Sequence, residues 1–170
     1  ADVTNFADAT DYRYSMGATA GDWNQDGFPD LVVGNIGEDS LLINNGDGTF
    51  TRQPITAPED ANRVPTSIAM ADLTADGCPD ILELSYVDDP KMIYLPRRNE
   101  NGDVLNAMSP MQYTPGHDRI CENDGRGGMS IKRFTTETNE LRTGLGLVVT
   151  DFLEHKPGSE IFVGTDLYPD

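Results

Sequence analysis

The sequence predicts an all-β fold assembled from repeated units of four short antiparallel strands. Apolar runs in this 170-residue chain are three to five residues long, and Gly, Pro, Asn or Asp bounds them. Strands have this length, whereas helical repeats need longer stretches with a 3.6-residue period. The segment 20–32 also recurs at 70–82, because Asp22 matches Asp72 at an offset of 50 residues. A four-stranded repeat of about 40–50 residues has the size of one propeller blade.

The first predicted blade covers about residues 17–56. Its strands are short and rich in β-branched and aliphatic residues, and the run Asn45-Gly46-Asp47-Gly48 predicts a tight hairpin turn. The predicted strands are 18–20, 31–33, 40–44 and one that begins at 49–51.

The second predicted blade covers about residues 67–135 and opens with a copy of the same acidic loop. Its third strand is predicted at 92–95. The irregular stretch 96–119, with three prolines, two glycines and little periodicity, is predicted to be an inserted hairpin or loop. Residues 120–127 then echo the turn region of the first blade, and the blade closes around 130–134.

A third, partial blade is predicted at about 144–170. It repeats the strand, loop, strand order, but its loop spans nine steps from Asp151 to Glu160 where the earlier loops span eight. Leu153 and His155 occupy its ligand-like positions, so we expect its metal site to be lost. About two and a half blades are therefore predicted, too few to close a propeller of the usual size.

Oxygen-bearing side chains alternate along the first loop, and Gly27 permits the positive φ that closes a tight curl. Three carboxylates, one amide oxygen and one backbone carbonyl suit the six- or seven-fold oxygen shell of Ca²⁺ better than the octahedral shell of Mg²⁺. The predicted ligands are Asp22, Asn24, Asp26, the carbonyl of Phe28, and Asp30.

The second loop repeats this pattern with a hydroxyl in place of the amide, so we expect a second structural Ca²⁺ site of lower affinity. Its Cys78 is expected to contribute a carbonyl and not a thiolate, because Ca²⁺ is a hard ion. The predicted ligands are Asp72, Thr74, Asp76, the carbonyl of Cys78, and Asp80.

The end of each loop excludes an EF-hand. An EF-hand needs a bidentate acid at position twelve and flanking helices, whereas position twelve counted from Asp22 is Val33 and the acid comes at position nine. The competing interpretation is a metal-free turn, since Asp-Gly and Asn-Gly are turn formers. Repetition in two blades, and the mutual repulsion of clustered acids, favour the metal.

Composition limits the classes of partner. The chain has 12 Lys and Arg against 29 Asp and Glu, a net charge of −17, which disfavours nucleic acid. No apolar run reaches the roughly 18 residues of a membrane span. Cys78 and Cys121 could pair, although two unpaired thiols fit at least as well.

These loops resemble the FG-GAP and VCBS repeats of integrin α-like seven-bladed β-propellers. Residues 21–35 followed by 41–50 are similar to a whole family repeat, blade 2 is similar in its calcium loop, and the third unit only loosely. The resemblance implies Ca²⁺ between the first two strands of a blade, at the residues named above. It also implies a secreted or surface-bound protein, located in the extracellular space, the periplasm or at the cell surface.

No catalytic motif accompanies the loops: Gly-x-Ser-x-Gly, His-Glu-x-x-His, a phosphate-binding loop and Cys-x-x-Cys are all missing from the sequence. The leading hypothesis is a non-catalytic, calcium-stabilised module for adhesion or recognition of an extracellular protein or carbohydrate. Candidate contact points are Trp23, Tyr86, Tyr94 and the 96–119 insertion. The alternative is a scaffold of a secreted polysaccharide-active enzyme whose active site lies outside this chain. In either case the blades are expected to associate with the remaining blades or with another chain.

Overall fold

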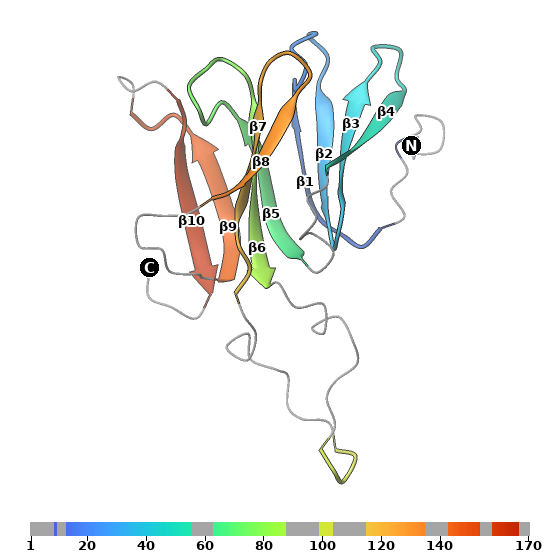
Figure 1. Ribbon diagram of the computed structural model, residues 1–170, viewed down its shortest axis with the longest axis vertical. Coiled ribbons are helices and arrows are strands. Elements are labelled where there is room, and N and C mark those ends of the chain that lie inside the picture. The colour runs from blue at the N-terminus through green and yellow to red at the C-terminus, as the bar shows by residue number, and fades with distance from the viewer. Residues whose placement is uncertain are drawn as a thin grey trace.

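The computed structural model describes residues 9, 13–55, 63–87, 99–103, 115–134, 143–153 and 158–166. Within these residues the chain forms three antiparallel sheets and no helix, which confirms the all-β prediction (Figure 1). Blade 1 has the sheet order β1 (Ser15–Gly21), β2 (Asp30–Asn35), β3 (Asp39–Asn44), β4 (Phe50–Ile55). Blade 2 has the order β5 (Val64–Ala71), β6 (Asp80–Val87), β7 (Arg119–Asn123), β8 (Met129–Arg133). Blade 3 contains β9 (Thr143–Thr150) and β10 (Glu160–Asp166).

The third strand of blade 2 differs from the prediction. It is β7 and not 92–95, because β6 pairs directly with β7 through Ile81 and Cys121, as β2 pairs with β3 through Leu31 and Leu42. The apolar run 92–95 has the composition of a strand, but among the described residues it is β7 that leads through the turn at 124–128 into β8. Residues 92–95, with Tyr94, and most of 96–119 lie outside the described residues.

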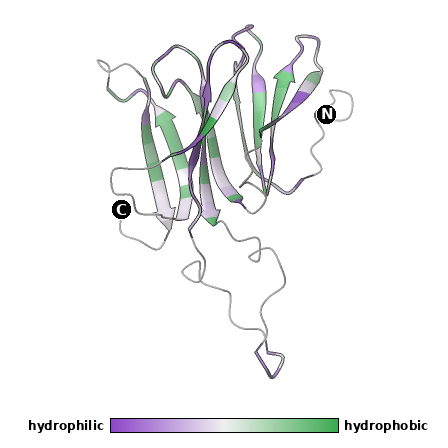
Figure 2. Cartoon of the chain, in the orientation of Figure 1, coloured by the Kyte–Doolittle hydropathy of each residue, from purple (hydrophilic) through white to green (hydrophobic). Residues whose placement is uncertain are grey.

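The three sheets stack side by side, with β5 of the middle sheet in contact with both β1 and β9 (Figure 1). Hydrophobic residues gather in the strands and hydrophilic residues in the connecting loops (Figure 2). The main core lies between blades 1 and 2, where Trp23, Val32 and Leu41 pack with Ile68 and Ile81. Burial of these side chains holds the two sheets face to face.

Close approach of the sheets requires glycine at one point of β1. A Cβ added to Gly21 would lie 2.5 Å from the Sδ of Met70 on β5, which is well inside van der Waals contact. Position 21 therefore accepts a larger residue only if the Met70 side chain moves.

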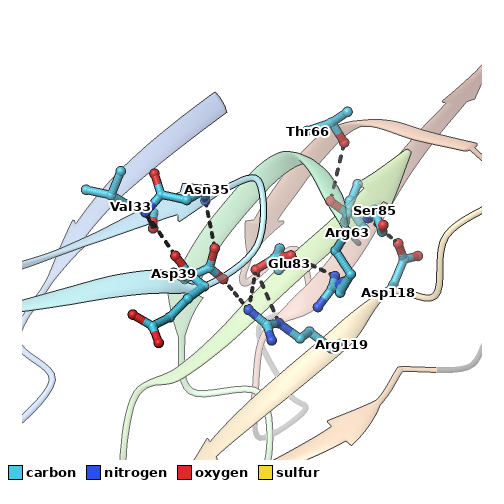
Figure 3. A network of polar contacts seen from close by, with 11 residues as sticks. Val33, Asn35, Asp39, Arg63, Thr66, Glu83, Ser85, Asp118 and Arg119 are labelled. Carbon is cyan, nitrogen blue, oxygen red and sulfur yellow. Dashed lines mark hydrogen bonds and ion pairs between the residues drawn. The ribbon is translucent and has the colours of Figure 1, made fainter. Parts of the chain in front are cut away.

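Four buried charged side chains also join blades 1 and 2 (Figure 3). Arg119 on β7 forms ion pairs with Asp39 at the start of β3 and, at 3.0 Å, with Oε2 of Glu83 on β6. Arg63, just before β5, lies 2.7 Å from Oε1 of Glu83. Because buried charges are costly unless paired, the network fixes how the two sheets register.

The network holds a proton at neutral pH. Burial raises the pKa of Asp39 to about 9; the hydrogen bond that protonated Asp39 donates to Glu83 and the charge of Glu83 add to the rise, and the Arg119 guanidinium opposes it. Burial disfavours ionised Glu83. The hydrogen bond that Glu83 accepts from Asp39 and the charges of Arg63 and Arg119 outweigh this effect, so the pKa of Glu83 lies below its ordinary value. The shared proton therefore resides on Asp39.

This proton gives stability a pH dependence of defined sign. The pKa of Asp39 rises from 3.8 in the unfolded chain to about 9 on folding, so its contribution is complete below pH 3.8 and is lost as pH rises through about 9. Glu83 acts in the opposite sense, but only as pH falls below its unfolded pKa of 4.5. We expect the free energy of unfolding, measured by urea titration, to fall between about pH 5 and pH 8. Asp39→Asn cannot titrate and should lose this slope; an unchanged slope would contradict the assignment.

Candidate metal-binding loops

The two acidic loops connect the first and second strands of blades 1 and 2 and adopt the same backbone conformation. Gln25 and Ala75 have φ of 58° and 60°, and Gly27 and Gly77 have φ of 90° and 88°. Positive φ costs a residue with a Cβ about 1 kcal/mol or more, so Gln25 and Ala75 are held there by the loop around them. The two loops predicted to be repeats from the sequence therefore also share the same strained backbone conformation.

Hydrogen bonds from the backbone to carboxylates shape the first loop. The two oxygens of Asp22 accept from the N–H groups of Asp26 (3.0 Å) and Gly27 (2.9 Å), and Oδ1 of Asp26 accepts from Phe28 N–H (2.9 Å). Asn24 donates from Nδ2 to Oδ2 of Asp26 at 2.8 Å. These contacts bring Asp22, Asn24 and Asp26 together on an exposed curl, as the alternation predicts.

The second loop reproduces these contacts with one change. Asp72 accepts from the N–H groups of Asp76 (3.2 Å) and Gly77 (3.0 Å), and Asp76 accepts from Cys78 N–H (2.8 Å). Thr74, in place of Asn24, turns its hydroxyl to Oδ2 of Asp80 at 3.1 Å. The hydroxyl predicted as a ligand is therefore engaged with the acid at position nine.

The acids at position nine are buried below the loops. The carboxylate of Asp30 accepts from Trp23 N–H (2.8 Å) and from Asn44 N–H at the end of β3 (2.7 Å). Asp80 accepts in the same way from Leu73 N–H (3.0 Å) and Asn123 N–H (3.0 Å). Each carboxylate thus ties its loop to the third strand of the blade, a structural role that the ligand prediction did not include.

Glu160 takes this role in the third loop, where its Oε2 accepts from Phe152 N–H (2.8 Å) and Leu153 N–H (3.2 Å). This loop is one residue longer than the other two, and its acid is the longer Glu where they have Asp30 and Asp80. Asp151 is exposed, and His155 lies outside the described residues. The lost metal site stays a prediction.

The side chains at position seven pack over the hairpin turn of their own blade. A Cβ added to Gly46 would lie 2.9 Å from the Phe28 ring, and one added to Gly125 would lie 2.6 Å from Sγ of Cys78. Desolvation and the carboxylates of Asp76, Asp72 and Asp80 raise the pKa of the Cys78 thiol, which keeps it neutral. Cys78 and Cys121 are both free thiols, so the pairing left open by the sequence is not formed.

The hard oxygen donors of both loops fit Ca²⁺ by chemistry. Among the described residues, however, no group of three or more His, Cys, Asp or Glu side chains is close enough to hold a metal. The carboxylates are instead arranged around backbone N–H groups, and Asp30 and Asp80 face the third strand. Calcium at the ten predicted ligand positions therefore stays a prediction.

Two of the aromatic residues predicted as contact points, Trp23 and Tyr86, are not fully exposed at the surface. Trp23 is 7% exposed and packs in the core between blades 1 and 2, so it is not a contact point. Tyr86 is half-buried and packs against Val64 and Val87. Neither aromatic ring offers an open stacking platform.

Stacked four-stranded sheets, each with an acidic loop between its first two strands, define a propeller-type repeat protein. Residues 22–83 match the family model described as FG-GAP-like repeat. The match covers most of blade 1 and, in blade 2, β5, the acidic loop and the start of β6, which confirms the family resemblance there. The comparison with curated proteins found no match. No helix in the described part of the chain could cross a membrane.

Proposed function

We propose that this chain is a calcium-stabilised, non-catalytic propeller module that recognises an extracellular protein or carbohydrate. The observation that carries the proposal is the doubled loop, in which hard oxygen donors alternate around the same positive-φ backbone at Gln25 and Ala75. Asp22, Asn24 and Asp26 would hold the ion in the first loop, with Asp30 and the Phe28 carbonyl completing the set. Bound Ca²⁺ would neutralise their repulsion and stabilise only the folded loop.

A location outside the cytoplasm is part of the proposal. FG-GAP repeats are typically extracellular, and millimolar calcium there saturates the weak sites of extracellular modules. The net charge of −17 also keeps the module apart from other polyanions, which favours neutral glycans or basic protein surfaces as ligands.

The calcium part is tested by thermal unfolding with Ca²⁺ and with EDTA. We expect Ca²⁺ to raise the melting temperature, because at a hundredfold excess over Kd a ligand adds about 2.7 kcal/mol of stability. Asp26→Ala should largely abolish the rise. Asp47→Ala is the matched control, since Asp47 is an exposed turn acid of the same blade outside the loop. A sample that melts at the same temperature in EDTA and in Ca²⁺ contradicts calcium binding.

The recognition part needs a separate readout. Calcium-saturated protein should bind members of a glycan array, or a basic extracellular protein, without releasing product. Cleavage of a polysaccharide by the calcium-saturated chain would contradict the non-catalytic part of the proposal.

A further inference from the structure

Three tight turns in the described part of the chain share one hydrogen-bonded geometry, at 45–49, 99–103 and 124–128. In each turn the N–H of the first residue donates to the carbonyl of the fifth, over 2.9, 3.0 and 3.1 Å in chain order. The fourth residue of each turn is a glycine with positive φ: Gly48, Gly102 or Gly127. The first and last of these turns join β3 to β4 and β7 to β8. The turn at 99–103, inside the predicted insertion, therefore has the form of a hairpin turn.

Two of these turns contain the Asn-Gly pairs of the sequence, Asn45-Gly46 and Asn101-Gly102, and both asparagines are exposed. The backbone nitrogen of the glycine can attack the side-chain amide of the asparagine before it, because glycine has no Cβ to shield that nitrogen. The attack requires the asparagine side chain to rotate until its Cγ faces the nitrogen. The contacts of each side chain therefore decide which pair reacts.

The Asn45 side chain is held at both ends. Its Nδ2 donates to the Thr49 hydroxyl, and its Oδ1 accepts from the Thr51 hydroxyl, each over 2.9 Å. Rotation toward the nitrogen of Gly46 would break both hydrogen bonds. The turn of blade 1 thus protects its Asn-Gly pair.

The Asn101 side chain forms no hydrogen bond within the described part of the chain. The backbone N–H of Asn101 donates to Oδ1 of Asn99 at 3.0 Å, and the same oxygen accepts from Asp103 N–H at 2.9 Å. Asn99 therefore holds this turn without help from the amide of Asn101. That amide is free to rotate toward Gly102.

Both glycine N–H groups are hydrogen-bonded, so this cost does not distinguish the two pairs. Gly102 N–H donates to the Asn99 carbonyl and Gly46 N–H donates to Oδ1 of Asn44, each over 2.9 Å. Each bond must open before the nitrogen can attack. The difference between the pairs lies in the side chains of Asn45 and Asn101.

We propose that Asn101 is a site of spontaneous deamidation. A hydroxide ion removes the proton of the Gly102 nitrogen, and this nitrogen forms a bond to Cγ of Asn101. The bond from Cγ to Nδ2 breaks, and Nδ2 takes up a proton and leaves as ammonia. Water then opens the resulting five-membered succinimide at either carbonyl carbon, which gives aspartate or isoaspartate. No oxidant or reductant takes part, and the inference goes beyond the proposed function and does not depend on calcium.

The two products act differently on the turn. Aspartate places a carboxylate at the position of Asp47 in the blade 1 turn, where Oδ1 of Asp47 accepts from Thr49 N–H at 2.9 Å. Isoaspartate instead adds a methylene to the main chain between the first and fifth residues of the turn. We therefore expect aspartate to preserve the 3.0 Å hydrogen bond from Asn99 N–H to the Asp103 carbonyl, and isoaspartate to disrupt it.

Peptide mapping by mass spectrometry, after incubation of the protein at mildly alkaline pH, tests the proposal. In the folded protein Asn101 should deamidate faster than Asn45 on the order of tenfold or more, because two hydrogen bonds must break at Asn45. In urea the two rates should converge, since neither side chain is then held. Asn101→Gln is the control: it should remove the reaction at position 101, because the longer side chain would have to close a six-membered ring, and leave the rate at Asn45 unchanged.

Thr51→Val tests the reason for the difference. The variant removes the hydroxyl that holds Oδ1 of Asn45 and keeps the β-branched shape that suits strand β4. Deamidation at Asn45 should rise roughly fivefold, while the rate at Asn101 stays the same. Equal rates at the two sites in the folded wild type overturn the proposal. An unmodified Asn101 in folded protein, under conditions that deamidate the urea-unfolded chain, overturns it as well.

Discussion

Arg119→Met is expected to lower the free energy of unfolding by about 3–5 kcal/mol, because it breaks a buried ion pair. The Glu83 carboxylate is then left with Arg63 as its cation, and protonated Asp39 loses its contact with the guanidinium. Arg119 bonds to Asp39 across the interface of blades 1 and 2 and to Glu83 within blade 2. Both carboxylates lie out of reach of water, so they cannot be rehydrated when the guanidinium is lost. Urea unfolding at neutral pH measures the change.

Acid should rescue part of the loss. Without Arg119 both carboxylates favour their protonated forms more strongly, so the folded variant binds more protons than the unfolded chain and its stability falls more steeply with rising pH than that of the wild type. Lys132→Met is the matched control: it breaks the exposed ion pair with Glu122, which is worth about 1 kcal/mol or less. Equal losses in the two variants would show that burial of the Arg119 network contributes nothing.

Features set by local chemistry were predictable from the sequence. The acidic loops and the Asn-Gly-Asp-Gly turn depend on residues close in sequence, and their contacts recur in both blades: Asn44 and Asn123 each turn the side-chain oxygen to the glycine two residues on, at 2.9 and 3.0 Å. The strand boundaries were underestimated, since polar residues such as Ser15 and Asn35 extend β1 and β2 by pairing. Pairing depends on the neighbouring strand and not on hydropathy.

Features set by distant residues were not predictable. Arg119 and Asp39 are 80 positions apart, and neither stands out in its local sequence. In the repeat alignment Arg119 occupies the place of Ser40, since it pairs with Glu83 as Ser40 pairs with Val33. Blade 2 thus has a Glu and an Arg at two paired strand positions where blade 1 has Val33 and Ser40. This opposite-charge pair was the sequence signal from which the buried network could have been predicted. The role of Asp30 was missed for another reason: an acid at position nine has the same sequence signature as a ligand and as an acceptor for buried N–H groups.

Asp30→Ala is the second variant with a large expected effect, and it separates these two roles. The substitution leaves the N–H groups of Trp23 and Asn44 without their acceptor in a buried site, at about 1–3 kcal/mol for each. We expect the free energy of unfolding, measured in EDTA, to fall by about 2–6 kcal/mol, because the two losses add when the N–H groups find no new partner. Calcium contributes nothing under this condition, so the loss reports the hydrogen bonds alone.

Asp26→Ala in EDTA is the comparison that decides between ligand and structural acceptor. Asp26 is exposed in the same loop, so water can replace its carboxylate, and its removal should cost much less than removal of the buried Asp30. In Ca²⁺ both variants should lose the calcium-induced rise in melting temperature. If Asp30→Ala and Asp26→Ala are equally stable in EDTA, Asp30 does not hold the blade together without metal. If only Asp30→Ala is strongly destabilised, the acid at position nine joins the loop to the third strand in the absence of metal. Calcium then binds to a loop that is already folded.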